Sequence, residues 1–372
     1  MLTKEENEML TRVGPGTPCG EMLRRYWWPI GFTEEITSLG APKPVRLLDE
    51  DLILFRDGQG RPGIIGLRCS HRQTSLEYGR VKAEGLRCPY HGWMYDVNGH
   101  CVDQPAEPEG STFRDRIQHL AYQAADLGGF IFAYLGPKPA PLLPRYDLLV
   151  REDGERTVQA GVDYCNWLQR AENPVDQAHL PFLHASGYPQ FAFTRPEIEW
   201  ERTWYGIRAL TKLPTIPEPK ISIYIFPAHN RFTSARVYGQ PGHSLHFRVP
   251  LDDHETATFG IRYIADPEGK HTALKTKGME RGEPYVYTPI ENGTWRVREE
   301  DRMVAELQGR ITDRSLEHLG HSDRGVILMR EMVKEAIEAV QQGRDPIGVI
   351  RDVEDNECIE FEASMYELAA LA

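Results

Sequence analysis

The sequence predicts an α+β protein with two main parts, a small all-β domain and a larger domain in which helices pack on an antiparallel sheet. The length of 372 residues exceeds that of one compact domain. Short apolar runs divided by turn residues fill 45–136, whereas the second half holds longer extended segments and amphipathic helices. Between them lies GPKPAPLLPRY at 136–146, whose four prolines are typical of a stiff linker.

The N-terminal part begins with a helix-like stretch at 5–13 that ends at the breaker GPGTPCG. Four β-type runs follow, namely VRLL, LILF, GIIGLRC and GFIFAYLG. We therefore predict three units: an N-terminal helical segment at 1–40 that packs on the larger domain, the β domain at 41–145, and the larger domain at 146–372.

Beyond the linker, WLQRAENPVDQAHLPFLH at 167–184 is helix-like in spite of Pro174. Extended segments and two closing helices are predicted after it, with strands at 197–211, 221–226, 244–250 and 255–264 and helices at 297–309 and 325–342.

The composition, 40% hydrophobic and 26% charged, is typical of a globular protein, and no apolar run approaches the roughly 18 residues that span a bilayer. The first residues, MLTKEENEML, lack the basic and apolar regions of a secretory signal. The net charge of −12 disfavours nucleic acid as a partner, because phosphate binding needs a basic face. Six cysteines are too sparse for a disulfide framework in a chain of this size, so we predict reduced thiols and a cytoplasmic protein.

The strongest motif signal is a pair of alternating motifs, C-x-H at Cys69 and His71 and C-x-x-H at Cys88 and His91. Each motif follows a β-type run, so two loops can direct four side chains at one centre. Two thiolates and two imidazoles suit a [2Fe–2S] cluster in which the cysteines hold one iron and the histidines the other. The alternative is structural zinc, whose sites usually pair like with like along the sequence. The alternation favours the cluster.

These motifs belong to a wider resemblance. The sequence resembles the α subunits of Rieske non-haem iron oxygenases that hydroxylate aromatic rings, in particular the phthalate-dioxygenase-like group. The matching strings are VGPGTPCGEMLRRYWWP, CSHRQTSLEYGRV, GLRCPYHGW, the stretch at 166–184, EEDRMVAELQGRI and DRSLEHLGHSDRGVILMR. The resemblance implies a Rieske [2Fe–2S] domain followed by a catalytic domain of the helix-grip, START-like type.

Two features of the loops qualify that resemblance. Gln73 and Thr74 stand where many relatives have a small Gly–Ala pair, which affects how the loop packs. Thr74 and Tyr90 occupy the places of the extra disulfide cysteines of high-potential Rieske proteins, so the resemblance implies the lower-potential, ferredoxin-like type.

A second set of candidates lies in the helix-like stretch, where His179 and His184 are five residues apart. Since residues four apart share a helix face, a bulge or helix end near Pro181 is needed to bring both rings to one metal. Two histidines near a helix end can also be capping or surface residues. A cluster needs a destination for its electrons, however, which favours a nearby Fe(II) site of two histidines and one carboxylate.

The carboxylate must come from elsewhere in the chain. Asp301 is our candidate, because its separation from His184 is similar to that in several resembling enzymes. Its competitors are acidic residues that a solvated helix face would also explain, namely Glu299, Glu300, Asp313 and Asp323.

Two neighbours of the histidines complete the predicted site. Asp176 precedes His179 by three residues, and a carboxylate that accepts a hydrogen bond from a metal-bound imidazole fixes its tautomer. The resemblance implies that Asp176 joins His179 to a cluster histidine of the neighbouring subunit, His91 in preference to His71. It also puts Asn173 beside the iron as a distant ligand or an O₂-facing donor, and a helix cap is the alternative.

The resemblance implies a terminal oxygenase component that uses O₂ and electrons from NAD(P)H, delivered by a separate reductase of the flavin and [2Fe–2S] type. It hydroxylates or dihydroxylates an aromatic, carboxylated substrate; the alternative is a monooxygenase that demethylates O- or N-methyl groups. The implied assembly is a homotrimer or a larger oligomer built from trimers. A Rieske ferredoxin is the rival from another class, but such a carrier would end near residue 140. Candidate pocket residues are Leu180, Phe182, Phe226 and Phe247, and candidate anchors for a substrate carboxylate are Arg236, Arg248 and Arg262.

Overall fold

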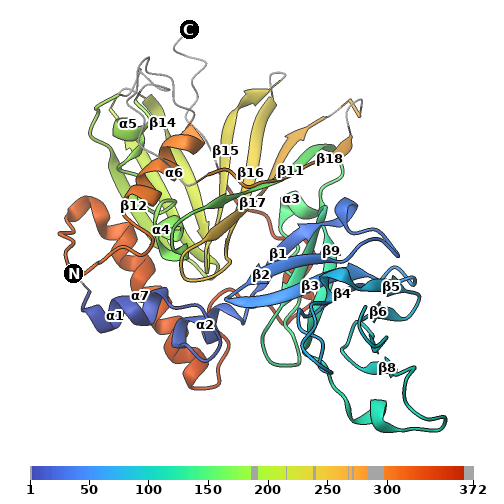
Figure 1. Ribbon diagram of the computed structural model, residues 1–372. Helices are drawn as coiled ribbons and strands as arrows, with labels where there is room; N and C mark the ends of the chain where they lie inside the picture. Colours follow the sequence, from blue (N-terminus) through green and yellow to red (C-terminus); the bar gives the residue numbers. More distant parts are fainter. Residues whose placement is uncertain are drawn as a thin grey trace.

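Three sheets organise the chain in the computed structural model, which describes residues 2–185, 192–214, 216–237, 240–266, 268–269, 272–283 and 297–363. A six-stranded and a four-stranded sheet form the part at the lower right of Figure 1, and an eight-stranded sheet with most of the helices forms the remainder. The prediction of an all-β domain followed by a domain of sheet and helices is confirmed.

The six-stranded sheet is antiparallel, in the order β1-β10-β9-β4-β3-β2. Its strands are β1 (Trp27–Phe32), β2 (Lys43–Leu47), β3 (Glu50–Arg56), β4 (Pro62–Gly66), β9 (Ala121–Leu127) and β10 (Phe130–Tyr134). Sequence patterning misses β1, whose run WWPIGF lies inside the segment 1–40 that we expected to be helical. Pro29 cannot donate to a ladder, and the register shifts between Pro29 and Gly31, which an edge strand tolerates.

The four-stranded sheet is a small subdomain at the far end of the β part, with β5 (Arg80–Lys82), β6 (Gly85–Arg87), β7 (Met94–Tyr95) and β8 (Cys101–Asp103). It has a separate apolar core, to which β3 contributes Ile53 and Phe55 and the small sheet contributes Leu86 and Tyr95. Loops that leave this core therefore start from fixed positions.

The eight-stranded sheet has the order β12-β13-β14-β15-β16-β17-β11-β18, with only the β11–β18 pair parallel. Its strands are β11 (Gly154–Asp163), β12 (Glu197–Arg202), β13 (Gly206–Leu213), β14 (Ile216–Ile225), β15 (His229–Val237), β16 (Gln240–Pro250), β17 (Thr256–Ala265) and β18 (Ala273–Glu280). The sequence prediction misses β11, β15 and β18. In β15 the buried Arg231 pairs with Asp147 at 3.0 Å, and a charge at an inward position hides the alternation that marks a strand.

Most helices lie on one side of this large sheet, at the left of Figure 1. The α-helices of the described residues are α1 (Lys4–Thr11), α2 (Pro18–Leu23), α3 (Asp147–Val150), α4 (Trp167–Glu172), α5 (Leu180–Leu183), α6 (Val297–Leu307) and α7 (Arg324–Gln341), and α3 lies apart from the others. The stretch 167–184 is thus two short helices, because Pro174 interrupts the hydrogen-bond ladder. None of the described helices is both long and apolar enough to cross a membrane.

The β part and the large sheet share one continuous apolar core. Phe32 of β1 packs on Phe259 of β17 at a centroid distance of 5.7 Å, and Phe132 of β10 packs on Phe247 of β16 at 5.6 Å. The proline-rich linker is also fixed, since Leu142 N donates to Ile350 O at 2.9 Å. These contacts hold the two parts in one relative orientation.

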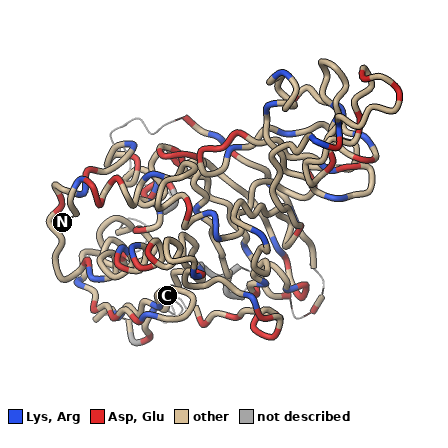
Figure 2. Tube along the Cα trace, turned by 90° about the horizontal axis from the view of Figure 1, so that it is seen from below, with Lys and Arg blue, Asp and Glu red and all other residues tan. Residues whose placement is uncertain are grey.

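Charged residues of both signs are interspersed over the whole trace (Figure 2), but one group of them is buried. The Glu172 carboxylate, at the end of α4, accepts hydrogen bonds from Arg314 at 2.9 Å and from Arg330 of α7 at 2.7 Å. Arg330 also pairs with Glu317 at 2.6 Å. This network ties α4, α7 and the 310–317 segment together, and so fixes the start of the segment that holds His179 and His184.

We expect Glu172→Ala to lower the free energy of unfolding by about 3 kcal/mol, because it leaves buried guanidinium groups without their shared carboxylate. Urea denaturation measures the effect. Glu335→Ala is the matched control: it breaks an ion pair with Arg202 whose side chains are 51% and 45% exposed, so its cost should stay below about 1 kcal/mol. Equal losses for the two variants would contradict a structural role for the buried network.

Candidate metal centres

Two loops of the β part bring Cys69, His71, Cys88 and His91 together. The first loop follows β4, and the second connects β6 to β7. Each is closed by its own backbone hydrogen bonds: Gln73 N donates to Cys69 O at 2.9 Å, and Cys88 N donates to Trp93 O at 2.8 Å. Both cysteines are buried in the small core, whereas His71 is exposed and His91 half-buried. The sulfur atoms therefore lie at the base and the imidazoles towards the surface.

The two imidazoles form a matched pair. Their ring centroids are 4.6 Å apart, and His71 stacks on Trp93 at 4.5 Å with an interplanar angle of 4°. Desolvation and the neighbouring His71 and Arg72 lower the pKa of His91, which favours the neutral imidazole that a metal needs. The donor set thus fits a cluster held by two sulfurs on one side and two neutral imidazoles on the other.

The loop residues that depart from the family pattern have defined positions. Gln73 has a φ of 59°, a left-handed conformation that glycine adopts with less strain. Tyr90 is 56% exposed beside His91. Sequence reasoning misses Tyr95, whose hydroxyl lies 3.2 Å from Cys69 Sγ and can hydrogen-bond a cluster sulfur ligand.

We expect Cys88→Ser to abolish the visible absorption and the reduced-state EPR signal of a [2Fe–2S] cluster, because serine removes a thiolate ligand. Cys101→Ser is the matched control, since Cys101 is buried in the same small core but lies outside the two motifs. It should keep both signals. A complete cluster spectrum in Cys88→Ser would exclude Cys88 as a ligand.

The second centre lies where the α4–α5 segment meets α6. One ligand atom each from His179, His184 and Asp301 lie within 4.8 Å of one another. The Asp301 Oδ1 atom is 3.2 Å from His184 Nε2 and 3.6 Å from His179 Nε2. The break after α4 makes this possible: His179 precedes α5 and His184 follows it, so five residues bring both rings to one side. Two imidazoles and one carboxylate are the donor set of a non-haem iron site.

Glu300 fixes the orientation of His184. The Glu300 Oε2 atom lies 2.6 Å from His184 Nδ1, so a proton on Nδ1 leaves Nε2 free to face Asp301 and a metal. Burial alone would lower the pKa of His184, but the carboxylates of Asp301 and Glu300 outweigh it and raise the pKa. Sequence reasoning treats Glu300 only as a competitor of Asp301. In the structure Glu300 is buried, with 4% of its surface exposed, whereas the neighbouring Glu299 is exposed, so Glu300 supports His184 and Glu299 faces solvent.

Asp301 is held in its ionised form. Burial alone would raise the pKa of its carboxyl, but the hydrogen bond with His184 and the charges of His179 and Arg170 outweigh it, and the pKa lies well below its usual range. Arg170 is itself buried, pairs with Asp163 at 3.0 Å and donates to the backbone oxygen of Asp301 at 3.1 Å. An ionised carboxylate is the form that binds a cation.

The two predicted neighbours are also close. Asn173 Nδ2 donates to Asp301 Oδ1 at 3.0 Å. Asp176 Oδ2 lies 3.5 Å from His179 Nδ1, a buried nitrogen without a hydrogen bond to any described residue. The Asp176 side chain is 34% exposed, so its carboxylate also faces outward.

The remaining acidic competitors lie in other settings. Asp313 accepts a hydrogen bond from Ser315 at 2.6 Å, and Asp323 accepts one from Gly320 N at 2.6 Å. Both carboxylates therefore stabilise local turns, and neither belongs to the group around His184.

The other candidate substrate contacts separate into two groups. Phe226 and Phe247 are buried in the main core, while Phe182 is 51% exposed next to His184. Arg262 is exposed, and Arg248 donates to Thr258 at 2.7 Å. The side chain of Arg236 lies outside the described residues.

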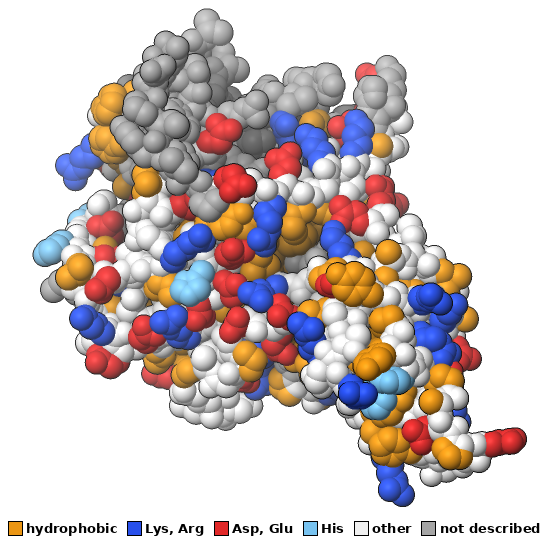
Figure 3. Space-filling model, viewed as in Figure 1, with side chains coloured by type: hydrophobic (Ala, Val, Ile, Leu, Met, Phe, Trp, Pro, Cys, Tyr) orange, Lys and Arg blue, Asp and Glu red, His pale blue; other side chains and the backbone are white. Residues whose placement is uncertain are grey.

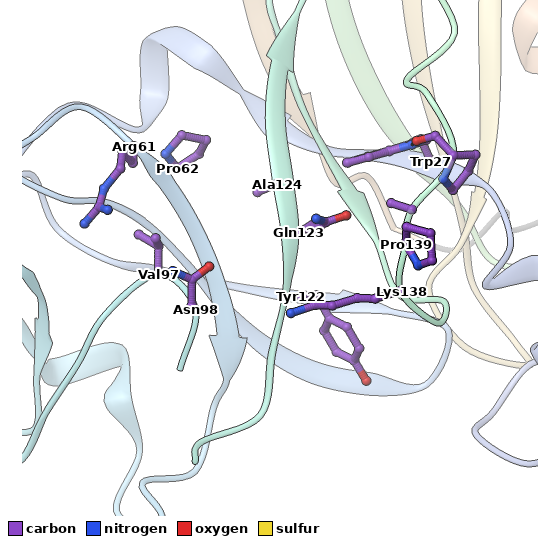
Figure 4. Close-up of a pocket in the computed structure, with 12 residues that line it drawn as sticks. Trp27, Arg61, Pro62, Val97, Asn98, Tyr122, Gln123, Ala124, Lys138 and Pro139 are labelled. Carbon is purple, nitrogen blue, oxygen red and sulfur yellow. The ribbon is translucent and has the colours of Figure 1, made fainter. Parts of the chain in front are cut away.

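A separate groove of about 920 Å³ runs between the six-stranded sheet and the linker (Figure 4). Trp27 and Lys138 lie at one end of it and Arg61 at the other. None of the candidate metal ligands lines this groove.

We expect Asp301→Ala to lose one of about three irons per subunit while the cluster spectrum stays complete. Glu300→Ala should keep the ligands but weaken iron binding by roughly 10- to 100-fold, because His184 loses its orienting carboxylate. Glu299→Ala is the matched neighbour control and should bind iron as the wild type does. Iron analysis after dialysis against a graded chelator measures all three. Full iron in Asp301→Ala would place the third ligand elsewhere.

The chain is similar to known proteins in sequence and in fold. Residues 26–120 match the family model described as the Rieske [2Fe-2S] domain, a range that begins just before β1 and includes both loops. The chain is 36% identical over 380 residues to the 5,5'-dehydrodivanillate O-demethylase oxygenase subunit of a Sphingobium strain, covering 96% of this chain and 86% of that protein. It is also 36% identical to the phenoxybenzoate dioxygenase subunit alpha of Ectopseudomonas oleovorans, covering 91% and 87%.

A solved structure shares the fold. The structure of Pseudomonas putida CBB5 NdmA with caffeine superposes with a TM-score of 0.70 and covers 87% of this chain and 94% of that chain. The sequence identity is 22%, so this likeness concerns the fold alone.

Proposed function

Because this chain belongs to the Rieske non-haem iron oxygenases, as an oxygenase subunit of the phthalate-dioxygenase-like group, we propose that it hydroxylates or dihydroxylates a small, carboxylated aromatic substrate. It is an oxidoreductase that carries a Rieske [2Fe–2S] cluster and a mononuclear iron and depends on a separate electron donor. We further propose that this donor is an NAD(P)H-dependent reductase. The observation that carries the proposal is the convergence of His179, His184 and Asp301.

We assign the ligands residue by residue. Cys69, His71, Cys88 and His91 would hold the cluster, and His179, His184 and Asp301 the mononuclear iron. The support is the donor chemistry of each set, with thiols and neutral imidazoles in one and two imidazoles with an ionised carboxylate in the other.

When bound, the cluster and the iron supply single electrons and O₂ activation. The chain's own residues then control geometry and charge. Glu300 keeps the proton of His184 on Nδ1, and Arg170 fixes the backbone at Asp301. Asn173 donates to Asp301 Oδ1, the same oxygen that lies near both imidazoles, and so orients this carboxylate. The side chains therefore set a rigid, partly open site.

Demethylation is the second candidate, and the name of the O-demethylase relative favours it. The chemistry is continuous with hydroxylation, because an oxygen atom inserted into an O-methyl C–H bond gives a hemiacetal that loses formaldehyde. The same protein machinery serves both outcomes, and the substrate decides between them.

Product analysis tests the proposal. The holoenzyme is supplied with a surrogate reductase, NADH and O₂, and the substrates are phthalate, 3-phenoxybenzoate and 3-methoxybenzoate. We expect an ¹⁸O-labelled diol or phenol from at least one acid, or formaldehyde from the methoxy compound, and none from Asp301→Ala. NADH consumption without labelled product from any aromatic acid or methoxy-aromatic would contradict the proposed substrate class.

We also propose that the chain works as a homotrimer in the cytoplasm, with the cluster of one subunit beside the iron of the next. Two observations support a contact between the small sheet of one subunit and the iron site of the next. Apolar side chains gather around a histidine on this subdomain, at the lower right of Figure 3, and the exposed ones include Tyr90 and Phe113. Asp176 presents an exposed carboxylate at the iron site. Head-to-tail contacts whose rotation closes form a ring.

Asp176→Asn should keep both metals and a reducible cluster but pass electrons slowly, because it loses the charge that would bridge His179 to a neighbour's His91. Single-turnover reoxidation of the reduced cluster with substrate and O₂ measures this step. Asp313→Asn, a change in a distant turn, is the matched control and should reoxidise at the wild-type rate. A fully active monomer in light scattering, or wild-type rates in Asp176→Asn, would exclude the route between subunits.

A further inference from the structure

Lys220 lies on the face of β14 that covers the iron-site segment. Its cross-strand partner is Thr211 of β13, and Ser222 follows it on the same face, two residues along the strand. The same face continues onto β12, where Trp200 donates from Nε1 to Val175 O at 2.9 Å. The segment between α4 and α5 therefore packs directly on this part of the sheet.

The described surroundings of Lys220 contain a cation but no paired anion. Its Nζ atom has one hydrogen-bond partner among the described residues, Gln177 Oε1 at 3.4 Å, and no described carboxylate lies within ion-pair distance. Gln177 is 3% exposed and also accepts from Ser222 Oγ at 3.2 Å. An ammonium group held among neutral dipoles is an incomplete arrangement, because buried charges are normally paired.

The surroundings of Lys220 disfavour its charged form. Burial lowers the pKa of Lys220 to about 8, and the charge of Asp301 only partly opposes it. Among the described residues, Asp301 is the carboxylate whose charge opposes this shift, yet we assign it to the iron, whose positive charge would neutralise it. No further carboxylate pairs with Lys220 among the described residues, so an anionic ligand can supply the second negative charge.

Resting on the proposed function, we propose that Lys220 is the specificity-determining residue of the substrate site and pairs with an anionic oxygen, a carboxylate or phenolate, of the aromatic substrate. Gln177, which accepts from the ammonium group of Lys220, positions that group on the sheet side of the iron-site segment. Thr211 Oγ1, buried and without a hydrogen-bond partner among the described residues, is next to it across the strands and can donate to the same anion.

The proposal favours Lys220 over Arg248 and Arg262, two of the three arginines that the sequence suggested. Arg248 belongs to the chain of contacts through Thr258 to Asp163, and Arg262 is exposed. Lys220 differs from both arginines. It is partly shielded from solvent, and it lies on the face of the sheet that packs on the iron-site segment.

The test is equilibrium binding to the iron-loaded holoenzyme, without reductase, by calorimetry. The probes are phthalate, 3-phenoxybenzoate and 3-methoxybenzoate, each beside its uncharged methyl ester (the diester for phthalate). We expect at least one acid to bind wild type more tightly than its ester. Lys220→Met should weaken that acid by about 10- to 100-fold, as for the loss of a hydrogen bond between charged groups, and leave the ester unchanged. Lys220→Arg should retain most of the preference.

Ser222→Ala separates recognition from positioning, because it removes the other donor to Gln177 without changing the charge. It should keep the preference for the acid, and Lys220→Met should keep wild-type iron content. Three results would overturn the proposal: an unchanged preference in Lys220→Met, no preference for any acid in wild type, or equal losses of acid and ester. The binding test and the product test fail separately. If the enzyme oxygenates only neutral aromatics, the proposed role of Lys220 is wrong and the proposed oxygenase activity stands. If acids bind in a Lys220-dependent way but no labelled product forms, the role of Lys220 in binding stands and the proposed oxygenase activity is wrong.

Discussion

The position of the Asp301 carboxylate is the constraint on which the iron site depends. Two histidines from the α4–α5 segment can hold a metal only if α6 brings its carboxylate to them from a distant part of the chain. Two consecutive side chains of α4 secure that meeting. Gln169 Nε2 donates to Ala305 O at 2.8 Å, and Arg170 donates to Asp301 O at 3.1 Å. These two side chains of α4 therefore hold α6 by its backbone oxygens, and the Asp301 carboxylate stays available to a metal.

The same constraint explains why so much buried charge surrounds the site. Arg170 would be costly in the core without Asp163, and Asp163 in turn accepts from Thr258 at 2.9 Å. Glu172, two residues further along α4, joins Arg314 and Arg330. Short helices have little stability of their own, so these pairs, with the core contacts of Trp167 and Leu168, hold α4 in place.

Local patterns predict the parts of the protein that are built locally. The alternating motifs of Cys69, His71, Cys88 and His91 depend on two tight loops, so spacing alone predicts the donor set. The five-residue step from His179 to His184 required a break in the helix, and Pro174 and Pro181 mark where the chain allows one. The closing helices and the strands β12, β13, β14, β16 and β17 of the large sheet follow from ordinary periodicity, whereas β11, β15 and β18 do not.

Long-range pairing limits what the sequence can predict. Among several neighbouring carboxylates, only folding decides that Asp301 faces the histidines and that Glu300 turns to His184 Nδ1. The strand β1 contains a proline and pairs with β10, a hundred residues away, which no local pattern indicates. Lys220 is an ordinary strand residue in the sequence, and the role that we propose for it depends on how the sheet covers the iron-site segment.

The central claim is that one mononuclear iron lies between His179, His184 and Asp301, apart from the cluster. An anomalous difference map at the iron edge, from crystals of the iron-loaded protein, tests it most directly. We expect one peak at the loops of the β part and a second in contact with those three side chains, with Glu300 bonded to His184 Nδ1 and not to the metal. A second peak with other ligands, or iron only at the loops in fully loaded and active protein, would contradict it.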